Sequence, residues 1–422
     1  METTDEPVEF VERVAALDLG KAALMACVRV PHEDRPDRRR QEIREYPTLS
    51  RSLLELADWL RCERIELVAM EATSDYWKPV FYLLEAEGFT CWLLNAKHVK
   101  NVPGRPKTDK LDAVWLAKVV ERGMCSPSLV HPKPIRQLRD LTRYRRSLIR
   151  ERTREKQRVE KLLEDAQIKL SSVISDVFGV SGREMLAALI TGQRSPKVLA
   201  QMARGSMRSK VAVLEEALTG HFEDHHGFLL QAMLDHVDAL SSQVDAVSAR
   251  IEAVIDPFSR DVERFDEIVG VGITAAQELI AEIGVDVTRF PSAAHLVSWA
   301  KFAPIDHNSA GKKRGGSTGK GNPWLAGTLG EIVASVSRTD TFLGERYRRL
   351  ARRIGKSRAI VAAGNSILTI IWHLLNDPDA HYQDLGSDHY QTKINTRRRE
   401  RDLVRQLEHL TGKKVTLAPA AA

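Results

Sequence analysis

The sequence predicts a chain in two parts, an α/β domain followed by all-α regions. Strand-like and helix-like runs alternate in the first third of the chain, beginning with Val14–Leu19. The stretch from Ile135 to Phe178 contains neither Gly nor Pro and predicts a very long helix. A second long helix with a coiled-coil seam is predicted by the unbroken apolar series Leu230, Met233, Val237, Leu240, Val244, Val247, Ile251 and Val254. This seam can close in either of two ways: against the first long helix within one chain, or between two chains.

The first third predicts a sheet of short strands with helices between them. A tight turn at Gly20 joins the first two strands into a hairpin, after which strands and helices alternate. The expected strands are Val14–Leu19, Ala22–Val30, Ile65–Met70 and Thr90–Asn95. The expected helices are Ser52–Arg61, Asp75–Glu87 and, after the N-cap residue Thr108, Asp109–Arg122. Residues 1–132 are therefore expected to form one α/β domain.

Proline and glycine divide the rest of the chain. Pro257 ends the second long helix, so residues 133–262 are expected to be a helical region, with an additional segment around Ser181–Phe228. Apolar residues alternate with Gly270 and Gly272 before a helix, which resembles the turn of a helix-hairpin-helix module; an ordinary turn between two helices gives the same pattern. Residues 263–376 are expected to form a helical C-terminal domain with a Gly/Lys-rich loop, and residues 377–422 a polar, partly disordered tail.

Basic residues gather in two blocks. The chain has a formal net charge of +6, but residues 133–161 hold 12 Lys and Arg against 4 acidic residues, and residues 310–358 hold 12 against 3. A single cluster of like charge is often only a solvated face. Two clusters favour a polyanionic partner, because neutralising phosphates releases counterions. The residues expected to bind nucleic acid are Arg143, Arg146 and Arg150 in the first block and Lys312, Lys313 and Arg314 in the second.

Nothing in the sequence directs the chain out of the cell or into a membrane. It contains no run of eighteen apolar residues, and its first thirty residues lack a basic segment followed by an apolar one. The four cysteines form no CxxC pair, so neither a disulfide framework nor a zinc site is expected. His221, Asp224, His225 and His226 also lack the spacing of zinc ligands. We expect a cytoplasmic protein with reduced thiols.

Four carboxylates occupy positions from which they can converge. Asp18 lies in the first strand, Glu71 follows the strand Ile65–Met70, and Asp109 and Asp112 are spaced i, i+3 at the start of a helix. Acidic residues are common at such positions, the last two because of the helix dipole. Together, however, they suit hard divalent cations, of which Mg²⁺ is expected, and two such ions stabilise both oxygens of an in-line phosphoryl displacement. The basic residues expected to contact nucleic acid beside them are Arg105, Lys107 and Lys110.

These motifs resemble those of one family, the DEDD transposases of the IS110 type. The resemblance rests on AALDLGK (15–21), VAMEAT (68–73), LLNAKHVKNVPGRPKTDKLDA (93–113), GVGITAAQELIAEIGVDV (270–287) and WAKFAPIDHNSAGKKRGGSTGKGN (299–322). Of these, KTDKLDA is the specific block, whereas ALDLG alone is a weak signal. The resemblance implies a RuvC-like, RNase H-like N-terminal domain with Asp18, Glu71, Asp109 and Asp112 as its acidic residues, and a C-terminal transposase domain.

The same resemblance implies a catalytic serine in the C-terminal domain. The matching position is Ser309, in the loop segment HNSAGK. A serine hydroxyl is a weak nucleophile until its proton is removed and the phosphate charge is offset, and the three basic residues that follow can offset that charge. The sequence departs from the family at Ala300–Lys301, where glycine is common, and at residues 317–322, where the family sequence is closer to SKRGN. These departures concern loop contacts more than the nucleophile.

The resemblance further implies that the recombinase acts on DNA as a dimer or a dimer of dimers and is guided by a structured RNA. Two other functions remain open. A RuvC-like junction nuclease would use Mg²⁺ and water and would not need Ser309, and a non-enzymatic coiled-coil nucleic-acid-binding protein would need none of the four carboxylates. An actin-like kinase or ATPase, which Asp18–Lys21 also suggests, is not expected, because the second half lacks the necessary Asp-Gly phosphate loop in a strand.

Overall fold

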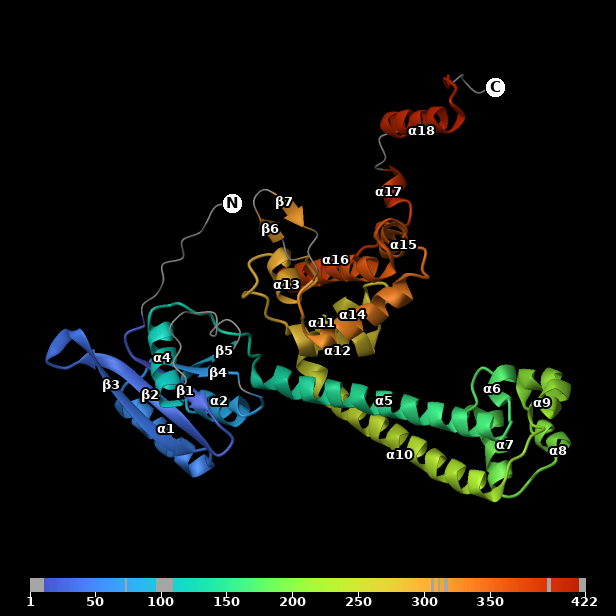
Figure 1. Ribbon diagram of the computed structural model, residues 1–422, viewed down its shortest axis with the longest axis horizontal. Helices are drawn as coiled ribbons and strands as arrows, with labels where there is room; N and C mark the ends of the chain where they lie inside the picture. Colours follow the sequence, from blue (N-terminus) through green and yellow to red (C-terminus); the bar gives the residue numbers. More distant parts are fainter. Residues whose placement is uncertain are drawn as a thin grey trace. The chain divides into compact units, whose positions relative to one another are not determined.

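The computed structural model describes residues 11–72, 74–95, 109–304, 307–309, 312–314, 318–392 and 396–416. These residues form two compact units, Met1–His131 and Pro132–Ala422 (Figure 1). The first unit contains the sheet, and the second is dominated by helices.

The first unit contains a five-stranded mixed sheet in the order β3-β2-β1-β4-β5. Its strands are β1 (Val14–Leu19), β2 (Ala23–His32), β3 (Arg35–Pro47), β4 (Leu67–Glu71) and β5 (Thr90–Leu94). The first three strands are antiparallel neighbours, whereas β4 runs parallel to β1 and β5 runs parallel to β4. This mixed sheet, together with the helices between its strands, confirms the predicted α/β class for the N-terminal part of the chain.

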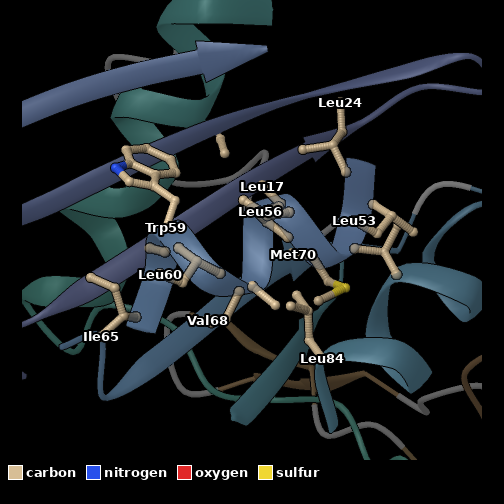
Figure 2. Close-up of a cluster of buried hydrophobic side chains, with 14 of the residues drawn as sticks. Leu17, Leu24, Leu53, Leu56, Trp59, Leu60, Ile65, Val68, Met70 and Leu84 are labelled. Carbon is tan, nitrogen blue, oxygen red and sulfur yellow. The ribbon is translucent and has the colours of Figure 1, made fainter. Parts of the chain in front are cut away.

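Helices cover both faces of this sheet. The helices α1 (Ser50–Cys62) and α2 (Trp77–Ala86) bury apolar side chains against one face, and α4 (Asp109–Glu121) buries them against the other. Because successive side chains of a strand point to opposite faces, β1 contributes Leu17 to the first apolar cluster (Figure 2) and Ala16 to the second. This alternation decides which face each functional side chain of a strand occupies.

The edge strand β3 is the strand of this sheet that the sequence did not predict. Its sequence, RPDRRRQEIREYP, is mostly charged, whereas the predicted strands were found as apolar runs. Pairing with β2 holds it in the sheet, and charged side chains on an edge strand protect the sheet from pairing with other chains. The other strands and helices of this unit agree with the predicted ranges to within two residues at either end.

The second unit begins with two long helices that pack against each other, α5 (Lys133–Asp165) and α10 (Asp224–Ile255) (Figure 1). Leu240 and Val244 of α10 share a buried cluster with Leu148 of α5. Most of the predicted apolar seam is buried, at Leu230, Val237, Leu240, Val244 and Ile251. Of the two arrangements that the sequence left open, the structure therefore shows the one within a single chain.

The helix α5 is shorter than predicted. The stretch without Gly or Pro continues to Phe178, but the helix ends at Asp165, and Gln167 has a φ of 60°. The chain then forms the short elements α6 (Leu170–Val173), α7 (Val180–Ile190), α8 (Pro196–Ala200), η1 (Gly205–Lys210) and α9 (Val211–Ala217). These pack with the adjoining ends of α5 and α10 in one apolar cluster. The absence of helix breakers permits a helix but does not set its length, because packing decides where the chain turns.

A helical domain around α16 (Lys356–Asn376) completes the second unit. The helices packed against α16 are α11 (Ser259–Asp266), α13 (Ala293–Trp299), α14 (Pro323–Val336) and α15 (Phe342–Ile354). The helix α12 (Ile273–Ile283) contacts both α5 and α14. The remaining elements are η2 (Asp256–Phe258), the strands β6 (His307–Ser309) and β7 (Lys312–Arg314), and the tail helices α17 (His389–Thr392) and α18 (Thr396–Thr411). The sequence analysis did not predict α18.

Among the described residues, α16 is the one helix that is long and apolar enough to cross a membrane by length and composition. The core helix of a folded domain meets the same criterion. Seven residues of α16, between Ala359 and Leu374, are buried against the surrounding helices.

Candidate active site and nucleic-acid interface

Asp18 and Glu71 occupy neighbouring positions near the ends of two parallel strands. The register pairs Leu17 of β1 with Met70 of β4, so the next residues along the two strands are Asp18 and Glu71. Adjacent strands in a sheet lie about 4.8 Å apart. The sheet therefore holds the two carboxylates as cross-strand neighbours, close enough to share a cation.

Both carboxylates belong to the face of the sheet that α4 covers. Ala16 and Ala69, two residues before Asp18 and Glu71, pack in the same cluster as the apolar residues of α4. Side chains two apart on a strand share a face, so Asp18 and Glu71 also point to this side. Asp18 is half-buried, and Glu71 is buried.

The helix α4 brings further acidic residues to this side of the sheet. Asp112 lies in the first turn of α4, half-buried, directly before the buried Ala113. Asp109 is the first residue of the helix, and its side chain and that of Lys110 lie outside the described residues. Arg105 and Lys107 also lie outside the described residues. The predicted group of four carboxylates is thus placed by the backbone on one side of the sheet, with three of the side chains described.

A buried ion pair fixes the far end of α4, and the sequence analysis missed it. The side chain of Glu121 is 4% exposed and forms two ion pairs. Its Oε2 atom lies 3.0 Å from Nη2 of Arg29 on β2, and its Oε1 atom lies 2.6 Å from Nε of Arg39 on β3. The missed strand β3 thus supplies one of the two arginines. Because charged pairs inside a protein need good geometry to offset their desolvation, this contact ties the helix to one position on the sheet.

The donor set suits a hard divalent cation. Asp18 lines a surface cavity together with Gly20, Met25 and Glu45, so its carboxylate lies beside a space open to solvent. Met25 is the register partner of both Asp18 and Glu45, which puts all three on the same face. Carboxylate oxygens beside solvent are the ligands that Mg²⁺ and similar ions prefer. The residues present therefore fit the metal that the sequence predicts.

The structure places Ser309 in a short β-hairpin, where the sequence analysis expected a loop. Ser309 ends β6, and β7 consists entirely of the basic residues Lys312, Lys313 and Arg314. The register pairs Ser309 with Lys312 and His307 with Arg314. The side chains of these residues lie outside the described part of the chain. By backbone pairing alone, the serine strand and the basic strand are direct neighbours.

The segments on either side of this hairpin are fixed to helices. Before it, the backbone carbonyl of Phe302 accepts a hydrogen bond from Asn365 Nδ2 of α16, at 3.2 Å. After it, Asn322 caps α14 by accepting from the backbone N–H of Trp324, at 3.0 Å. A Cβ atom at Gly321 would lie 2.6 Å from the carbonyl oxygen of Ala300, so only glycine permits the two segments to approach this closely. The hairpin therefore projects from a rigid base.

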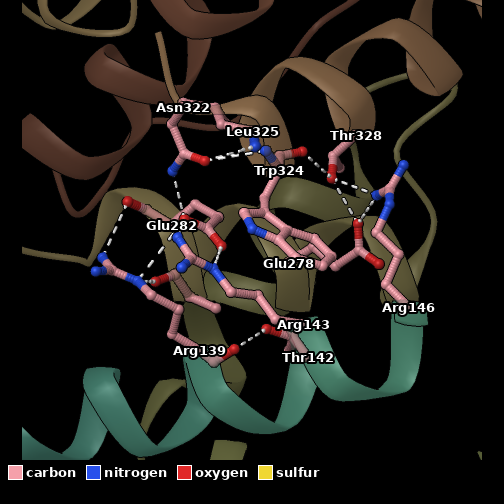
Figure 3. A network of polar contacts seen from close by, with 11 residues as sticks. Arg139, Thr142, Arg143, Arg146, Glu278, Glu282, Asn322, Trp324, Leu325 and Thr328 are labelled. Carbon is pink, nitrogen blue, oxygen red and sulfur yellow. Dashed lines mark hydrogen bonds and ion pairs between the residues drawn. The ribbon is translucent and has the colours of Figure 1, made fainter. Parts of the chain in front are cut away.

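Arg143, predicted to bind phosphate, instead forms an internal ion pair (Figure 3). Its Nε and Nη2 atoms donate to the two carboxylate oxygens of Glu282 on α12, at 2.7 and 2.8 Å, and Asn322 Nδ2 donates to the same carboxylate at 2.5 Å. Burial alone would raise the pKa of Glu282, but the hydrogen bonds and charge of Arg143 hold it below its usual value. The charge of Arg143 is thus already balanced inside the fold.

Arg146, also predicted to bind nucleic acid, makes its contacts inside the fold. Its side chain is 8% exposed, and its Nη1 atom contacts Glu278 at 2.5 Å and Thr328 at 2.8 Å (Figure 3). Its Nη2 atom contacts Glu331. A buried guanidinium whose hydrogen bonds are made internally has no surface to offer to a phosphate. The sequence analysis counted positive charges without seeing their partners, which lie more than 130 residues away.

Arg150 remains a candidate for nucleic-acid binding. It is exposed, and its guanidinium lies over the ring of Trp324, 5.2 Å from the centroid. Stacking on an aromatic ring orients a guanidinium without using up its hydrogen-bond donors. Of the three arginines predicted in this block, Arg150 is thus the one that presents its charge to solvent.

The turn between α11 and α12 is the one that resembles a helix-hairpin-helix module. Gly270 has a φ of 86°, and Gly272 precedes the first residue of α12. A Cβ atom at Gly270 would lie 2.4 Å from Cγ2 of Val336, so one face of the turn packs against α14. The phosphate-binding role of this turn stays a prediction.

Asp165, His225 and His226 come together at the junction of α5 and α10, with ligand atoms within 4.8 Å of one another. The buried His226 accepts a hydrogen bond at Nδ1 from the backbone N–H of Glu223, at 3.1 Å. A neutral histidine that accepts at Nδ1 carries its proton on Nε2, where it faces Asp165 at 3.3 Å. This arrangement gives His226 a capping role at the start of α10.

The comparisons with known proteins define the class as a transposase, an enzyme that cuts DNA. Residues 15–168 match a DEDD family of IS110 described as "Transposase", and residues 262–348 match the "Transposase IS116/IS110/IS902 family". Together the matches span more than half of the chain and include all four predicted carboxylates and Ser309. The chain belongs to the IS110 family of DEDD transposases.

Other comparisons were less informative. A search of curated proteins found no match. Among solved structures, the chain is similar to T. thermophilus RuvC in complex with a Holliday junction substrate, at 16% sequence identity and a TM-score of 0.20, over 28% of this chain and 99% of that one.

Proposed function

We propose that this transposase is a DNA recombinase that cuts and rejoins strands through a covalent bond between Ser309 and DNA. In this proposal Asp18, Glu71, Asp109 and Asp112 hold Mg²⁺. The observation that carries the proposal is the register of β1 and β4, which makes Asp18 and Glu71 cross-strand neighbours on the face covered by α4. Acidic residues brought together in this way suit a cation, because like charges that face each other across neighbouring strands repel.

The chemistry is a phosphoryl transfer in two displacements. The hydroxyl of Ser309 loses its proton and attacks the phosphorus of a DNA phosphodiester, and one strand oxygen leaves as a hydroxyl. A hydroxyl of another strand then attacks the phosphoserine, which restores Ser309 and joins the strands. The basic strand β7 beside Ser309 offsets the phosphate charge. Mg²⁺ held by Asp18, Glu71, Asp109 and Asp112 would supply charge stabilisation for phosphate oxygens of the DNA.

The proposed partners are nucleic acids and further copies of the chain. The DNA substrates are the ends of the insertion element and its target, and a structured RNA is proposed to guide the choice between sites. The exposed Arg150 and the basic strand β7 support a polyanionic partner. We also propose a homo-oligomer, a dimer or a dimer of dimers, acting in the cytoplasm.

Trapping of a protein–DNA adduct tests this function. Wild-type protein incubated with Mg²⁺ and end-containing DNA should give an adduct that resists denaturant and maps to the peptide around Ser309. Ser309→Ala should bind the same DNA but give neither adduct nor strand exchange. Ser335→Ala, at an exposed position of α14 outside the hairpin, is the control and should behave as wild type. Cleavage by Ser309→Ala at the wild-type rate, with no adduct from wild type, would favour the water-using nuclease. Nucleic-acid binding without strand cleavage in wild type, unchanged when the four carboxylates are replaced, would favour the non-enzymatic binder.

A further inference from the structure

A cavity of about 650 Å³ lies at the base of the Ser309 hairpin. Its lining includes Pro304 and Thr318, the nearest described residues that line it on either side of the hairpin segment. Pockets for small organic ligands have volumes of about 300 to 1,000 Å³, so this cavity is large enough for a small organic group. Pro304 and Thr318 connect it along the chain with the segment that carries Ser309.

The walls of the cavity are apolar on one side. Phe302, Ile354 and Val361 line it. The ring of Phe302 packs directly on the backbone of Gly364, so closely that a Cβ atom at Gly364 would lie 2.5 Å from Cε1 of the ring. An aromatic ring held in place by the backbone of a neighbouring helix is suited to contact with a flat ligand.

The rim of the cavity is cationic. Arg346 and Arg358 line it, with Ser357 beside them, and no carboxylate is among its described lining residues. Ser357 and Arg358 lie in the first turn of α16, which has no side-chain cap. Uncapped N–H groups in a first turn favour anions, so they add to the attraction of the two guanidinium groups for a phosphate.

Asn365 supplies a directional acceptor. Its Nδ2 atom donates to the carbonyl of Phe302, which assigns the other amide atom, Oδ1, as the acceptor. Among the described residues, none donates a hydrogen bond to this Oδ1 atom. An acceptor without a donor in a partly apolar cavity favours a ligand that carries an amino group.

We propose that this cavity holds one unpaired nucleotide next to the phosphate attacked by Ser309. Its base lies against Phe302 and Val361, its phosphate lies at Arg346 and Arg358, and Asn365 Oδ1 accepts from an exocyclic amino group. The cavity holds a base only when that base has left its stack, which costs the least in single-stranded or unpaired nucleic acid. The role of this nucleotide in the reaction rests on the proposed function, whereas its binding in the cavity does not.

Binding of nucleoside 5′-monophosphates to the full chain, measured by ligand-observed NMR or calorimetry, tests the proposal. The deoxyribonucleotides of A, C, G and T and the ribonucleotides of A, C, G and U are the probes. We expect saturable binding, weakest by about tenfold for T and U, which lack an exocyclic amino group. The sugar that binds more tightly identifies DNA or RNA as the source of the nucleotide.

Three variants locate the binding. Val361→Trp fills the cavity, and Arg358→Glu reverses a charge at its rim; each should weaken binding at least tenfold. Arg250→Glu makes the same charge change at an exposed position of α10 and should have no effect. Melting curves establish that each variant is folded, and Arg358→Glu, at an exposed position, serves if Val361→Trp does not fold. No saturable binding, or binding that survives both Val361→Trp and Arg358→Glu in folded protein, would overturn the proposal.

Ser309→Ala separates this proposal from the proposed function. It should bind the monophosphates as wild type does, because the cavity does not require the serine hydroxyl. If monophosphates bind but wild type forms no DNA adduct, the cavity stands and the serine mechanism fails. If the adduct forms but no monophosphate binds, the serine mechanism stands and the cavity proposal fails.

Discussion

Arg143 of α5 and Glu282 of α12 form a two-pronged ion pair, with N–O distances of 2.7 and 2.8 Å. Asn322, which caps α14 after the Ser309 hairpin, donates to the same carboxylate. One buried carboxylate thus joins the long helix α5 to the segment that follows the serine strand. The position of the hairpin in its own unit therefore depends on this contact.

Glu282→Gln is expected to lower the free energy of unfolding of this unit by about 2–3 kcal/mol, because it leaves Arg143 without its counter-charge. The pKa of Glu282 is lowered in the folded state. The pair therefore stabilises the fold above the unfolded pKa of about 4.3, and this contribution is lost as the pH falls through the folded pKa.

Thermal melting from about pH 7 down to about pH 3 measures this effect. Wild type should lose stability towards acid more steeply than Glu282→Gln. Glu216→Gln, at an exposed position of α9, is the control and should follow the wild-type curve. Parallel curves for wild type and Glu282→Gln would show that the ion pair does not contribute to acid sensitivity.

The sequence predicted those elements whose pattern is local. The apolar run Val14–Leu19 matches β1, and the apolar seam of the second long helix matches the buried side of α10. The missed strand β3 has a charged sequence, because as an edge strand it is held by backbone pairing and not by an apolar core. Local patterns therefore identified buried elements and failed for one that depends on its neighbour.

The residues of the candidate site were likewise predictable only where the pattern is local. The acidic motif positions were visible in the sequence because strands and helix starts are local features. The internal partners of Arg143 and Arg146 were not visible, because Glu282 and Glu278 are 139 and 132 residues away along the chain. Positive charge in a sequence shows neither whether it faces solvent nor what balances it. Only the packing of α5 against α12 and α14 separates Arg146 from Arg150.

Leu240→Ala is expected to lower the stability of the α5–α10 pair by about 2–4 kcal/mol. Leu240 is 4% exposed and packs with Leu148 and Val244, so the shorter side chain leaves a cavity between the helices. Chemical denaturation monitored by circular dichroism gives the size of the loss, and Gln243→Ala, at an exposed position of the same helix, is the control. Because the seam closes within the chain, light scattering should report the same assembly size for both variants. A smaller assembly from Leu240→Ala would place the seam between chains.

Substitution of each carboxylate by its amide should remove strand cleavage in Mg²⁺ without unfolding the protein. Asp18→Asn, Glu71→Gln, Asp109→Asn and Asp112→Asn should each reduce the cleavage rate by about two orders of magnitude or more, because an amide binds a hard cation poorly. Asp58→Asn is the control, since Asp58 lies exposed on α1, which covers the opposite face of the sheet. Wild-type cleavage by any one of the four amide variants would remove that residue from the site.

Cys62 should be the first cysteine to react with iodoacetamide. It is exposed, whereas burial raises the pKa of Cys27 and Cys91 to about 12 and that of Cys125 to about 11. At about pH 8 these three thiols are almost entirely protonated, and the thiolate is the reactive form. Peptide mass spectrometry after short labelling should show Cys62 modified at least about tenfold faster than the others. In denaturant all four should react alike, and rapid labelling of Cys27 in the folded protein would contradict its burial.

Arg150 and Arg146, one helical turn apart on α5, should differ in their effects on nucleic-acid binding and on stability. Arg150 is exposed over Trp324, so Arg150→Glu should leave the melting temperature nearly unchanged and weaken binding to DNA or RNA. If it makes one phosphate contact, the slope of log affinity against log salt should become shallower by about one unit. Arg146→Ala should instead destabilise the fold by about 3–5 kcal/mol, since it leaves Glu278, whose side chain is only 12% exposed, without its cationic partner.

Salt titrations of binding, carried out at a temperature at which every variant is folded, separate these two roles. Arg146→Ala should keep the wild-type slope, because its guanidinium makes no phosphate contact. Arg51→Glu, at an exposed position of α1, controls for the change in net charge and should also keep that slope. A slope for folded Arg146→Ala as shallow as that for Arg150→Glu would return Arg146 to the nucleic-acid surface. An unchanged slope for Arg150→Glu would make this part of α5 a solvated face, and the polyanion would then bind elsewhere, with β7 as the next basic segment to test.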